Sequence, residues 1–338
     1  MFTHSMRCAV VAGAAFILIP AVSAAEPIKL KLAFYTSDRT NVYQVAVKPF
    51  VEAVNAEGKG LIAVEVYFSG VLGKLQTEQP RLVLDGVADI AFVSPGITPD
   101  LFHDNKIIEL PGLFHDMREA TLTYTRLIAK DLLKGYEDFF VIGAFASDPE
   151  TIHSRPPVPS LDSLKGRKIR ANNSTAAAAL EKLGMAPAVM PINMISDAIS
   201  SGNLDGAAIP PSMLFEFGIG RVAGHHYLLQ TSAAPLALLM NRRKFDSLPV
   251  QAQNIIRKYS GEWAAARYIE AREVIENQAM EQMKSDSRRK VVFPSRSDLD
   301  RAGAAFKAVT DEVVSKTPRD REMLKAARSE VAKLRPAD

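Results

Sequence analysis

The chain has 338 residues, a formal charge of +3 at pH 7, one cysteine and 47% hydrophobic residues. Nearly balanced charge argues against a nucleic-acid-binding protein, which usually has a concentrated basic face, and one cysteine excludes a disulfide framework. The composition is that of a folded globular protein long enough for more than one hydrophobic core, so we expect two lobes.

The first 25 residues are typical of a cleaved secretory signal peptide. Arg7 precedes an apolar run over 9–20, and the small residues Ala24 and Ala25 offer a cleavage site. The run is short for a membrane span, which favours cleavage over an uncleaved anchor. Cys8 lies inside this segment, so it cannot carry a lipid anchor at the cleavage point. We therefore expect an exported, periplasmic protein.

Strands and helices alternate from residue 28 onward. Apolar and charged residues alternate in IKLKLAF and again in LIAVEVYF, as they do in strands. Strands are expected over 28–34, over 61–68 and within 85–95, with helices over 47–60 and near 77–84. This βαβαβ order is typical of a mostly parallel sheet with helices on its faces.

The same order returns after Pro159. Strands are expected over 166–171, 186–191 and 204–211, with helices over 174–184 and, capped by Asn193, over 193–202. The third-strand passages align without gaps: Gly86, Asp89, Ala91, Val93 and Pro95 match Gly202, Asp205, Ala207, Ile209 and Pro211. Ordinary turn preferences could produce such a match, but its recurrence within equivalent units favours two similar lobes.

The rest of the chain predicts elements that connect these units. Residues 148–166 are rich in proline and serine and indicate an extended crossing, and 236–241 predicts a strand. The segment from Pro249 to Lys284, capped by Ser247, predicts one helix long enough to brace both lobes. A strand within 289–294 and two C-terminal helices follow.

We therefore expect an α/β protein with two lobes and a ligand cleft between them. Lobe 1 is expected over 26–147 plus about 250–297, and lobe 2 over 148–249 plus about 298–330.

No catalytic motif stands out. The segment GIGRVA (218–223) fits a dinucleotide fingerprint but follows a predicted helix instead of a strand. The sequence lacks a G-x-S-x-G elbow, and its one cysteine lies in the predicted signal peptide. His225 and His226 are adjacent, point different ways on regular structure and have no further ligand cluster. We expect no enzyme activity, no cofactor and no metal site.

The segment LKGRKIRANNST (164–175) is the strongest candidate for binding. Arg170 lies near the end of a predicted strand, and Asn173 or Ser174 can cap the helix that follows. Ligands of open α/β sheets bind beyond the carboxyl ends of strands, so a guanidinium and free helix N–H groups there would form an anion site. Lys165 and Arg167 are most simply solvated. A salt bridge within the lobe explains Arg170 equally well from position alone.

Several motifs, in order, extend this interpretation: SGVLG, GVADIAF, ELPGLF, LKGRKIRANNS, LGMAPAVMP, ISSGNLDGAAIPP and FDSLPVQAQ. Over nearly the whole mature chain, the sequence resembles the solute-binding subunit of tripartite ATP-independent periplasmic (TRAP) transporters, the DctP-type family. The resemblance implies two α/β lobes, a long helix bracing both and a cleft that closes on an organic acid. The acid is then handed to a membrane permease.

The resemblance also implies binding residues: Arg170 for the substrate carboxylate, Asn173 for a polar contact, and Pro210, Pro211 and Met213 at the cleft. From the first lobe, Phe34 and Tyr35 could pack against the ligand, although aromatic residues at strand ends are often core. The stretch ASDPETIHS lacks the arginine of sialic-acid-binding members, and AAIPP lacks a polar residue after the D-G dipeptide. Both departures favour a monocarboxylate with an apolar or aromatic body. An exported two-lobed enzyme acting on a small acid and a ligand-presenting protein for a sensory receptor remain alternatives.

Overall fold

A computed structural model describes residues 26–335. The predicted signal peptide lies outside the described residues. Within residues 26–335, no helix combines the length and the apolar character needed to cross a membrane.

The first sheet has five strands in the order β2-β1-β3-β10-β4. They are β1 (Ile28–Ala33), β2 (Ile62–Tyr67), β3 (Ile90–Val93), β4 (Phe139–Ala146) and β10 (Pro235–Asn241). Strands β1, β2 and β3 are parallel, as the βαβαβ pattern predicts, whereas β10 runs antiparallel to both β3 and β4.

The second sheet has six strands in the order β11-β9-β5-β8-β6-β7. They are β5 (Thr151–Ser154), β6 (Lys168–Ala171), β7 (Ala186–Val189), β8 (Gly206–Ile209), β9 (His225–Tyr227) and β11 (Lys290–Val292). Strands β6, β7 and β8 repeat the parallel arrangement of the first sheet, and β5 is antiparallel to β8 and β9.

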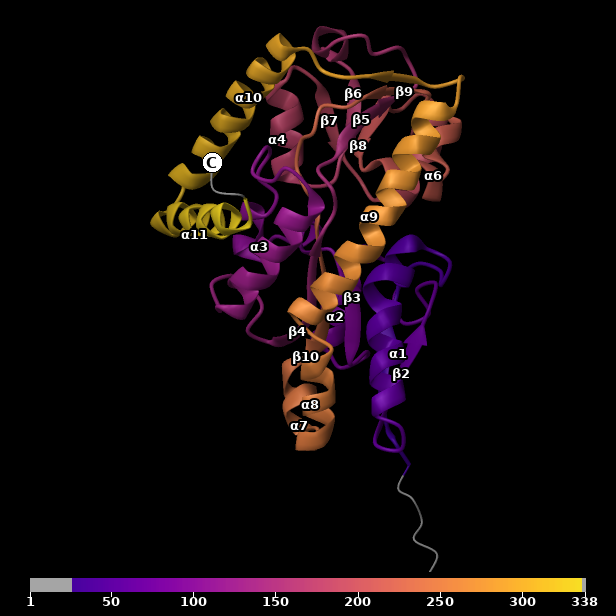
Figure 1. Cartoon of the computed structure of the whole chain (residues 1–338), viewed down its shortest axis with the longest axis vertical. Coiled ribbons are helices and arrows are strands. Elements are labelled where there is room, and N and C mark those ends of the chain that lie inside the picture. The colour runs from indigo at the N-terminus through magenta and orange to yellow at the C-terminus, as the bar shows by residue number, and fades with distance from the viewer. Residues whose placement is uncertain (1–25, 336–338) are drawn as a thin grey trace, which may run out of the picture.

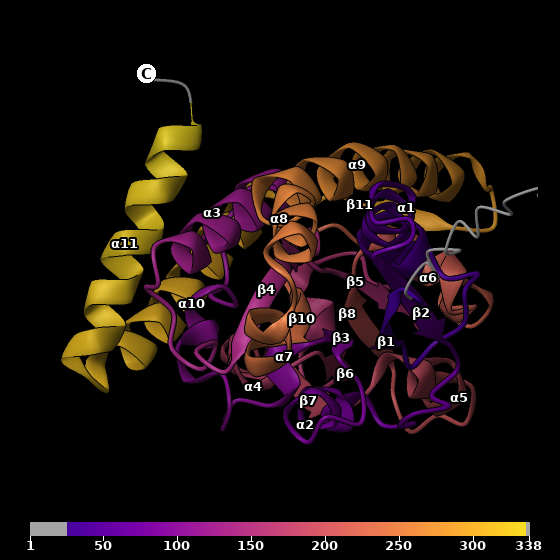
Figure 2. The same ribbon diagram turned by 90° about the horizontal axis from the view of Figure 1, so that it is seen from below.

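Helices cover both sheets and link them (Figures 1 and 2). They are α1 (Lys48–Glu57), α2 (Gln79–Leu84), α3 (Met117–Ala129), α4 (Ser174–Lys182), α5 (Ile195–Ser200), α6 (Pro211–Glu216), α7 (Arg242–Ser247), α8 (Val250–Lys258), α9 (Glu262–Ser285), α10 (Arg296–Ser315) and α11 (Pro318–Leu334). The two-lobed α/β fold expected from the sequence is thus confirmed. Helix α5 begins after a short turn at Ile192–Met194 without a side-chain cap, so the expected cap at Asn193 is wrong.

The repeated aspartate has the same role in both sheets. The Asp89 carboxylate accepts a hydrogen bond from the backbone N–H of Lys31 at 2.8 Å, and Asp205 accepts one from Lys168 at 2.8 Å. Each aspartate follows a glycine with positive φ, 73° at Gly86 and 79° at Gly202. The glycine closes a helix in the left-handed conformation, and the aspartate ties the next strand to its parallel neighbour. The sequence repeat therefore marks a structural repeat.

The expected single helix from 249 to 284 is two helices. The chain leaves α8 after Lys258 and starts α9 at Glu262, and Gly261 between them has φ 61° and ψ −125°. The Gly261 N–H donates to the carbonyl of Ile142 in β4 at 2.8 Å, which fixes the turn against the first sheet. Ser247 does not cap α8; its hydroxyl donates to the carbonyl of Lys244. Helix α9 alone, about 36 Å long at 1.5 Å per residue, lies beside both sheets (Figure 1).

The expected lobe bounds misplace two strands. Strand β10, assigned by sequence to the second lobe, fills the first sheet between β3 and β4. Strand β11, assigned to the first lobe, pairs with β9 in the second sheet. Both errors have one cause: the chain crosses between the sheets more often than the two βαβαβ units indicate. The C-terminal helices also bridge the lobes, because α10 packs on α4 and α11 packs on α3.

Candidate ligand-binding site

A cavity lies where the two sheets and α6 meet. Its polar wall consists of Thr36, Gln76, Ser94, Ser147, Glu150, Arg170, Asn172 and Glu216. Its apolar wall consists of Tyr35, Val42, Phe92, Ile192, Pro210, Met213, Phe217, Ala234 and Leu236. The cavity volume is about 50 Å³, room for one or two water-sized groups. An organic acid therefore enters only if the walls move apart.

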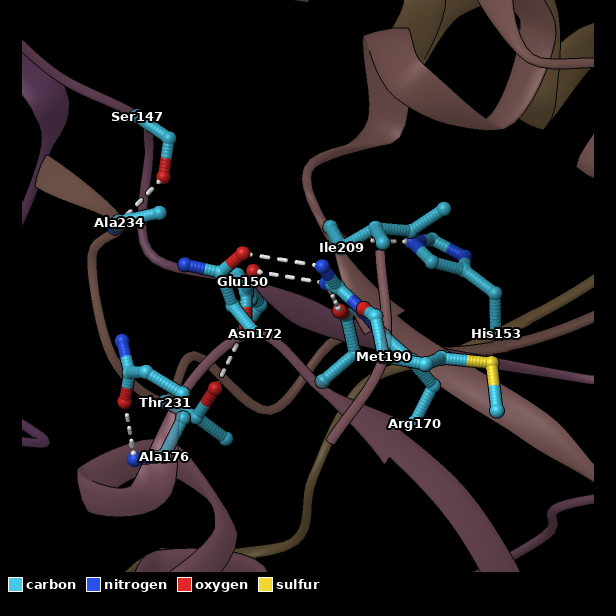
Figure 3. A network of polar contacts seen from close by, with 12 residues as sticks. Ser147, Glu150, His153, Arg170, Asn172, Ala176, Met190, Ile209, Thr231 and Ala234 are labelled. Atoms are coloured by element: carbon cyan, nitrogen blue, oxygen red, sulfur yellow. Dashed lines mark hydrogen bonds and ion pairs between the residues drawn. The ribbon is translucent and has the colours of Figure 1, made fainter. Parts of the chain in front are cut away.

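Arg170 supplies a fixed positive charge to this cavity. It is 3% exposed at the end of β6, and Figure 3 shows its guanidinium turned toward Glu150 and Asn172. Its Nε donates to the carbonyl of Met190 at 3.0 Å, Nη1 to that of Ala208 at 3.2 Å, and Nη2 to Asn172 Oδ1 at 2.9 Å. These bonds from three segments hold the guanidinium plane in one orientation, as recognition of a planar carboxylate requires.

Glu150 places a buried carboxyl beside that guanidinium. Its Oε1 lies 3.5 Å from Arg170 Nη1, and the residue is 2% exposed. The backbone of Glu150 is held by Ser232 and Thr231 where two segments cross between the lobes. Burial raises the pKa of Glu150 to about 7, against the opposing effect of the Arg170 charge. The salt bridge within the lobe that the sequence left open is therefore present, but it is long and lies in the cavity wall.

The first lobe contributes a small hydrogen-bonded group opposite. Gln76 donates through Nε2 to the Tyr35 hydroxyl at 3.0 Å and to Ser94 Oγ at 2.6 Å. Burial raises the pKa of Tyr35 to about 12, so the phenol keeps its proton. This group offers hydroxyls and no charge to a bound molecule.

Hydrogen bonds join helix α6 to α9. These bonds fix the position of Met213 and Glu216, the residues of α6 in the cavity wall. Glu276 on α9 accepts from the backbone N–H of Ser212 at 3.0 Å, and Arg272 Nη2 donates to the Ser212 hydroxyl at 2.7 Å. Arg272 and Glu276 form an ion pair at 2.6 Å. Because α9 also packs on the first lobe, this cluster links the cavity wall to both lobes.

Comparison with known proteins identifies the family. Residues 32–317 match the family described as bacterial extracellular solute-binding protein, family 7 (DctP). The chain belongs to this family.

The chain is similar along most of its length to individual members of family 7. It is 28% identical over 266 residues to the C4-dicarboxylate-binding periplasmic protein DctP of Rhodobacter capsulatus, covering 78% of this chain and 80% of that protein. It is 27% identical over 213 residues to a solute-binding protein of Verminephrobacter eiseniae, covering 62% of this chain and 63% of that one.

A solved structure is similar to nearly the whole chain. It is a TRAP solute-binding protein from a marine metagenome, specific for aromatic acid ligands and in complex with metahydroxyphenylacetate. The TM-score is 0.82 at 25% sequence identity, covering 90% of this chain and 99% of that one. The family 7 chain described here thus has the fold of periplasmic binding proteins.

Four of the seven residues that the sequence proposed for binding line the cavity of this family 7 protein: Tyr35, Arg170, Pro210 and Met213. Phe34 and Pro211 do not. Phe34, 1% exposed, belongs to the core of the first lobe, where its ring packs against those of Tyr35 and Phe92. Pro211 is buried as the first residue of α6.

Asn173 also lies off the cavity. Its Oδ1 accepts from the backbone N–H of Ala176 at 2.8 Å, so it caps α4 as one sequence interpretation predicted. The neighbouring Asn172 occupies the cavity wall in its place. Because the first turn of α4 does not line the cavity, the expected convergence of Arg170 with free helix N–H groups is absent there. The Asn173 amide lies beside Gly96 of the first lobe instead.

The sequence missed Gln76, Glu150, Asn172 and Glu216. Asn172 could have been predicted, because it lies two residues beyond Arg170 in the segment 164–175 that the sequence indicated for binding. Glu150 lies in the ASDPETIHS stretch, for which the sequence predicts no binding residue. No local pattern separates a buried glutamate from a solvated one.

Two buried histidines lie away from the cavity wall. His153 on β5 and His226 on β9 are paired across the sheet, with their Nδ1 atoms 2.8 Å apart. Within residues 26–335, no group of three or more histidine, cysteine or acidic side chains could hold a metal ion. Burial lowers the pKa of His153 to about 4 and also lowers the pKa of His226.

Proposed function

We propose that this solute-binding protein captures an organic acid with a single carboxylate and an apolar, preferably aromatic, body. The observation that carries the proposal is Arg170, buried and oriented by carbonyl groups, in the wall of a cavity that Phe92 and Phe217 also line. A guanidinium pairs with one carboxylate through two parallel hydrogen bonds, and aromatic walls favour a flat apolar body. The similar marine protein specific for aromatic acid ligands supports the same class.

We further propose that Tyr35, Pro210 and Met213 contact this body, and that Asn173 acts indirectly by holding α4. The chain would be exported to the periplasm and would deliver the acid to the membrane permease of a TRAP transporter. Membership of family 7 supports this assignment over an exported enzyme. Turnover of a bound acid would favour the enzyme. Delivery to a sensory receptor is the other alternative, and a permease encoded beside the protein would argue against it.

A thermal-shift screen tests the proposal. Benzoate, meta-hydroxyphenylacetate, succinate and a sugar acid are compared, because a ligand that binds only the folded state stabilises it by mass action. We expect the two aromatic monocarboxylates to raise the melting temperature most. A shift from succinate or the sugar acid alone would contradict the proposed class.

Two variants test whether Arg170 binds the ligand carboxylate. Arg170→Lys keeps the charge but not the planar fork, and we expect it to weaken benzoate binding by about 2 kcal/mol or more, roughly 30-fold. Lys168→Ala is the matched control, since Lys168 is exposed on the same strand. Equal loss in both variants would contradict a specific role for Arg170.

A further inference from the structure

The cavity wall contains an acidic side chain, Glu150, beside the guanidinium that would bind a ligand carboxylate. Arg170 has five N–H donors, and four hydrogen bonds or close contacts occupy them: Met190, Ala208, Glu150 and Asn172. One N–H is therefore left. A ligand carboxylate that takes two donors must displace one existing partner.

Glu150 is the partner most easily displaced. Its 3.5 Å contact with Nη1 is at the limit of hydrogen bonding, whereas the Asn172 contact is 2.9 Å. The second oxygen of Glu150, Oε2, is buried and accepts no hydrogen bond from any described residue. A buried carboxyl oxygen without a partner costs free energy, so Glu150 has an unmet capacity for a hydrogen bond at the cavity wall.

The charges in the cavity determine whether Glu150 donates that hydrogen bond as a protonated carboxyl or accepts it as a carboxylate. Arg170 and an ionised Glu150 together carry no net charge, so an incoming carboxylate would leave a buried net charge of −1. Two carboxylates beside one guanidinium repel each other, and the repulsion is relieved when one of them binds a proton. The ligand carboxylate is the one that stays ionised, because it accepts the shorter hydrogen bonds from Arg170, and Glu150 is the one that binds the proton.

We propose that Glu150 is a ligand-binding residue: it takes up a proton from solvent when an organic acid binds, and its protonated carboxyl donates a hydrogen bond to the ligand carboxylate held by Arg170. This inference rests on the proposed function. The ligand therefore binds as an anion together with one proton, and the site retains no net charge.

The surroundings of Glu150 favour the protonated form. Burial raises the pKa of Glu150 to about 7, and the carboxyl of Glu109, from the segment before α3, contributes to this rise. Elsewhere in the cavity wall, Glu216 adds another carboxyl, and the Tyr35 phenol adds no charge. Asp148, two residues away, is itself an acid whose pKa burial raises to about 7. Arg170 is the only cation in the cavity wall and the only group there that opposes protonation.

Titration calorimetry with benzoate tests the inference, because benzoate stays ionised above about pH 5.5. We expect the dissociation constant to be constant below about pH 7 and to rise about tenfold per pH unit above it. In two buffers with different ionisation enthalpies, proton uptake should rise from near zero at about pH 6 to nearly one at about pH 8. Binding without proton uptake or pH dependence would overturn the inference.

Glu150→Gln is the decisive variant, since its amide donates a hydrogen bond at every pH. It should bind benzoate within about threefold of wild type at about pH 6 and lose the pH dependence. A loss of more than about tenfold at pH 6 would mean that a hydrogen-bond donor at this position does not replace the carboxyl of Glu150, and would overturn the inference. So would an affinity that requires Na⁺ or Ca²⁺ and disappears in Glu150→Gln, because the carboxylate would then hold a cation.

Glu109→Gln is the matched control. Burial also raises the pKa of Glu109 to about 7, but this residue does not line the cavity. The variant should keep the rise of about tenfold per pH unit in the dissociation constant, with its onset at a lower pH because Glu109 no longer raises the pKa of Glu150. A dissociation constant that no longer depends on pH would assign the proton to Glu109. If no acid in the panel binds at any pH, the proposed function fails. If acids bind without proton uptake, only the role of Glu150 fails.

Discussion

The Glu216 carboxylate accepts a hydrogen bond from the backbone N–H of Asn41 at 3.0 Å. Glu216 ends α6 in the second lobe, and Asn41 begins the helical segment that continues into α1 in the first lobe. The N-terminus of a helix carries partial positive charge and free N–H groups, so a carboxylate is favourable there. This contact therefore joins the lobes beside the cavity and stabilises the closed arrangement.

Glu216→Ala should shift the ligand-free protein toward an open arrangement. A hydrogen bond to a charged group contributes about 1.5 to 3 kcal/mol, so benzoate affinity should fall by about 10-fold to 100-fold as closure becomes less favourable. Pulsed electron paramagnetic resonance measures the change. The only cysteine precedes residue 26, so spin labels at Val71→Cys and Val189→Cys, both exposed, report one distance.

Glu216→Gln controls for this effect. Its carbonyl can still accept from the Asn41 N–H, so the lobe distance should stay closer to wild type than in Glu216→Ala. If neither variant changes the distance while both weaken binding equally, Glu216 acts on the ligand and does not hold the lobes.

A neutral analogue tests the charge of the ligand directly. Benzamide has nearly the shape of benzoate but no negative charge, so Arg170 would remain paired only with groups of the protein. We expect benzamide to bind at least about 100-fold more weakly, since charge-assisted pairs with buried partners contribute a few kcal/mol. Competition calorimetry against benzoate measures the difference. Similar affinities would mean that the apolar body alone holds the ligand.

The turn between α8 and α9 gives a prediction for stability. Gly261 has φ 61° and ψ −125°, a conformation that residues with a Cβ rarely adopt. An added Cβ at Gly261 meets no atom within 4 Å, so backbone strain is the whole cost. Gly261→Ala should lower the free energy of unfolding by about 1 to 3 kcal/mol, measured by urea denaturation.

Gly303→Ala is the matched control with the opposite sign. Gly303 lies within α10, and its added Cβ also meets no atom within 4 Å. Alanine is favoured over glycine in a helix by about 0.5 to 1 kcal/mol, so this variant should be more stable than wild type. Equal effects of the two substitutions would show that the turn at Gly261 is not strained by a side chain.

The parallel parts of both sheets were predictable because their signals are local. Alternating residues in β1 and β2 and the shared glycine and aspartate positions specify strand, turn and helix within short windows. The break at Gly261 was missed because the hydrophobic pattern of α8 runs on into α9, and only contact with Ile142 in β4 selects the turn.

Antiparallel additions to the sheets could not be predicted in the same way. Strand β10 was recognised as a strand, but its pairing with β3 and β4 depends on residues far away in sequence. Strands β5 and β9 are only four and three residues long and are largely buried, so no alternation of apolar and polar residues marks them. At the site, Arg170 was singled out by its position at a strand end together with the family resemblance, whereas Glu150 acquires its role only from its three-dimensional neighbours.

The buried histidine pair predicts loss of stability in acid. His153 and His226 are both 0% exposed and in contact, and Arg289 Nη1 lies 3.5 Å from His226 Nε2. Burial lowers the pKa of both residues in the folded protein below the ordinary value of 6.5. At these two sites the unfolded chain therefore binds more protons below about pH 6.5, so the contribution of the pair to stability falls as pH falls. Buried acids whose pKa is raised, such as Glu150, act in the opposite direction.

Each histidine that stays neutral in the folded state costs about 2 kcal/mol of stability between about pH 6.5 and pH 5. Urea denaturation at several pH values measures this slope. His226→Asn removes one titrating group, so it should be less stable than wild type at about pH 8 but lose less stability on acidification. His103→Gln, at an exposed position, should follow the wild-type slope. If His226→Asn and wild type lose stability in parallel, protonation of this pair does not drive unfolding, and carboxylates whose pKa is lowered in the folded protein, such as Glu119 beside Arg335, must account for the pH dependence.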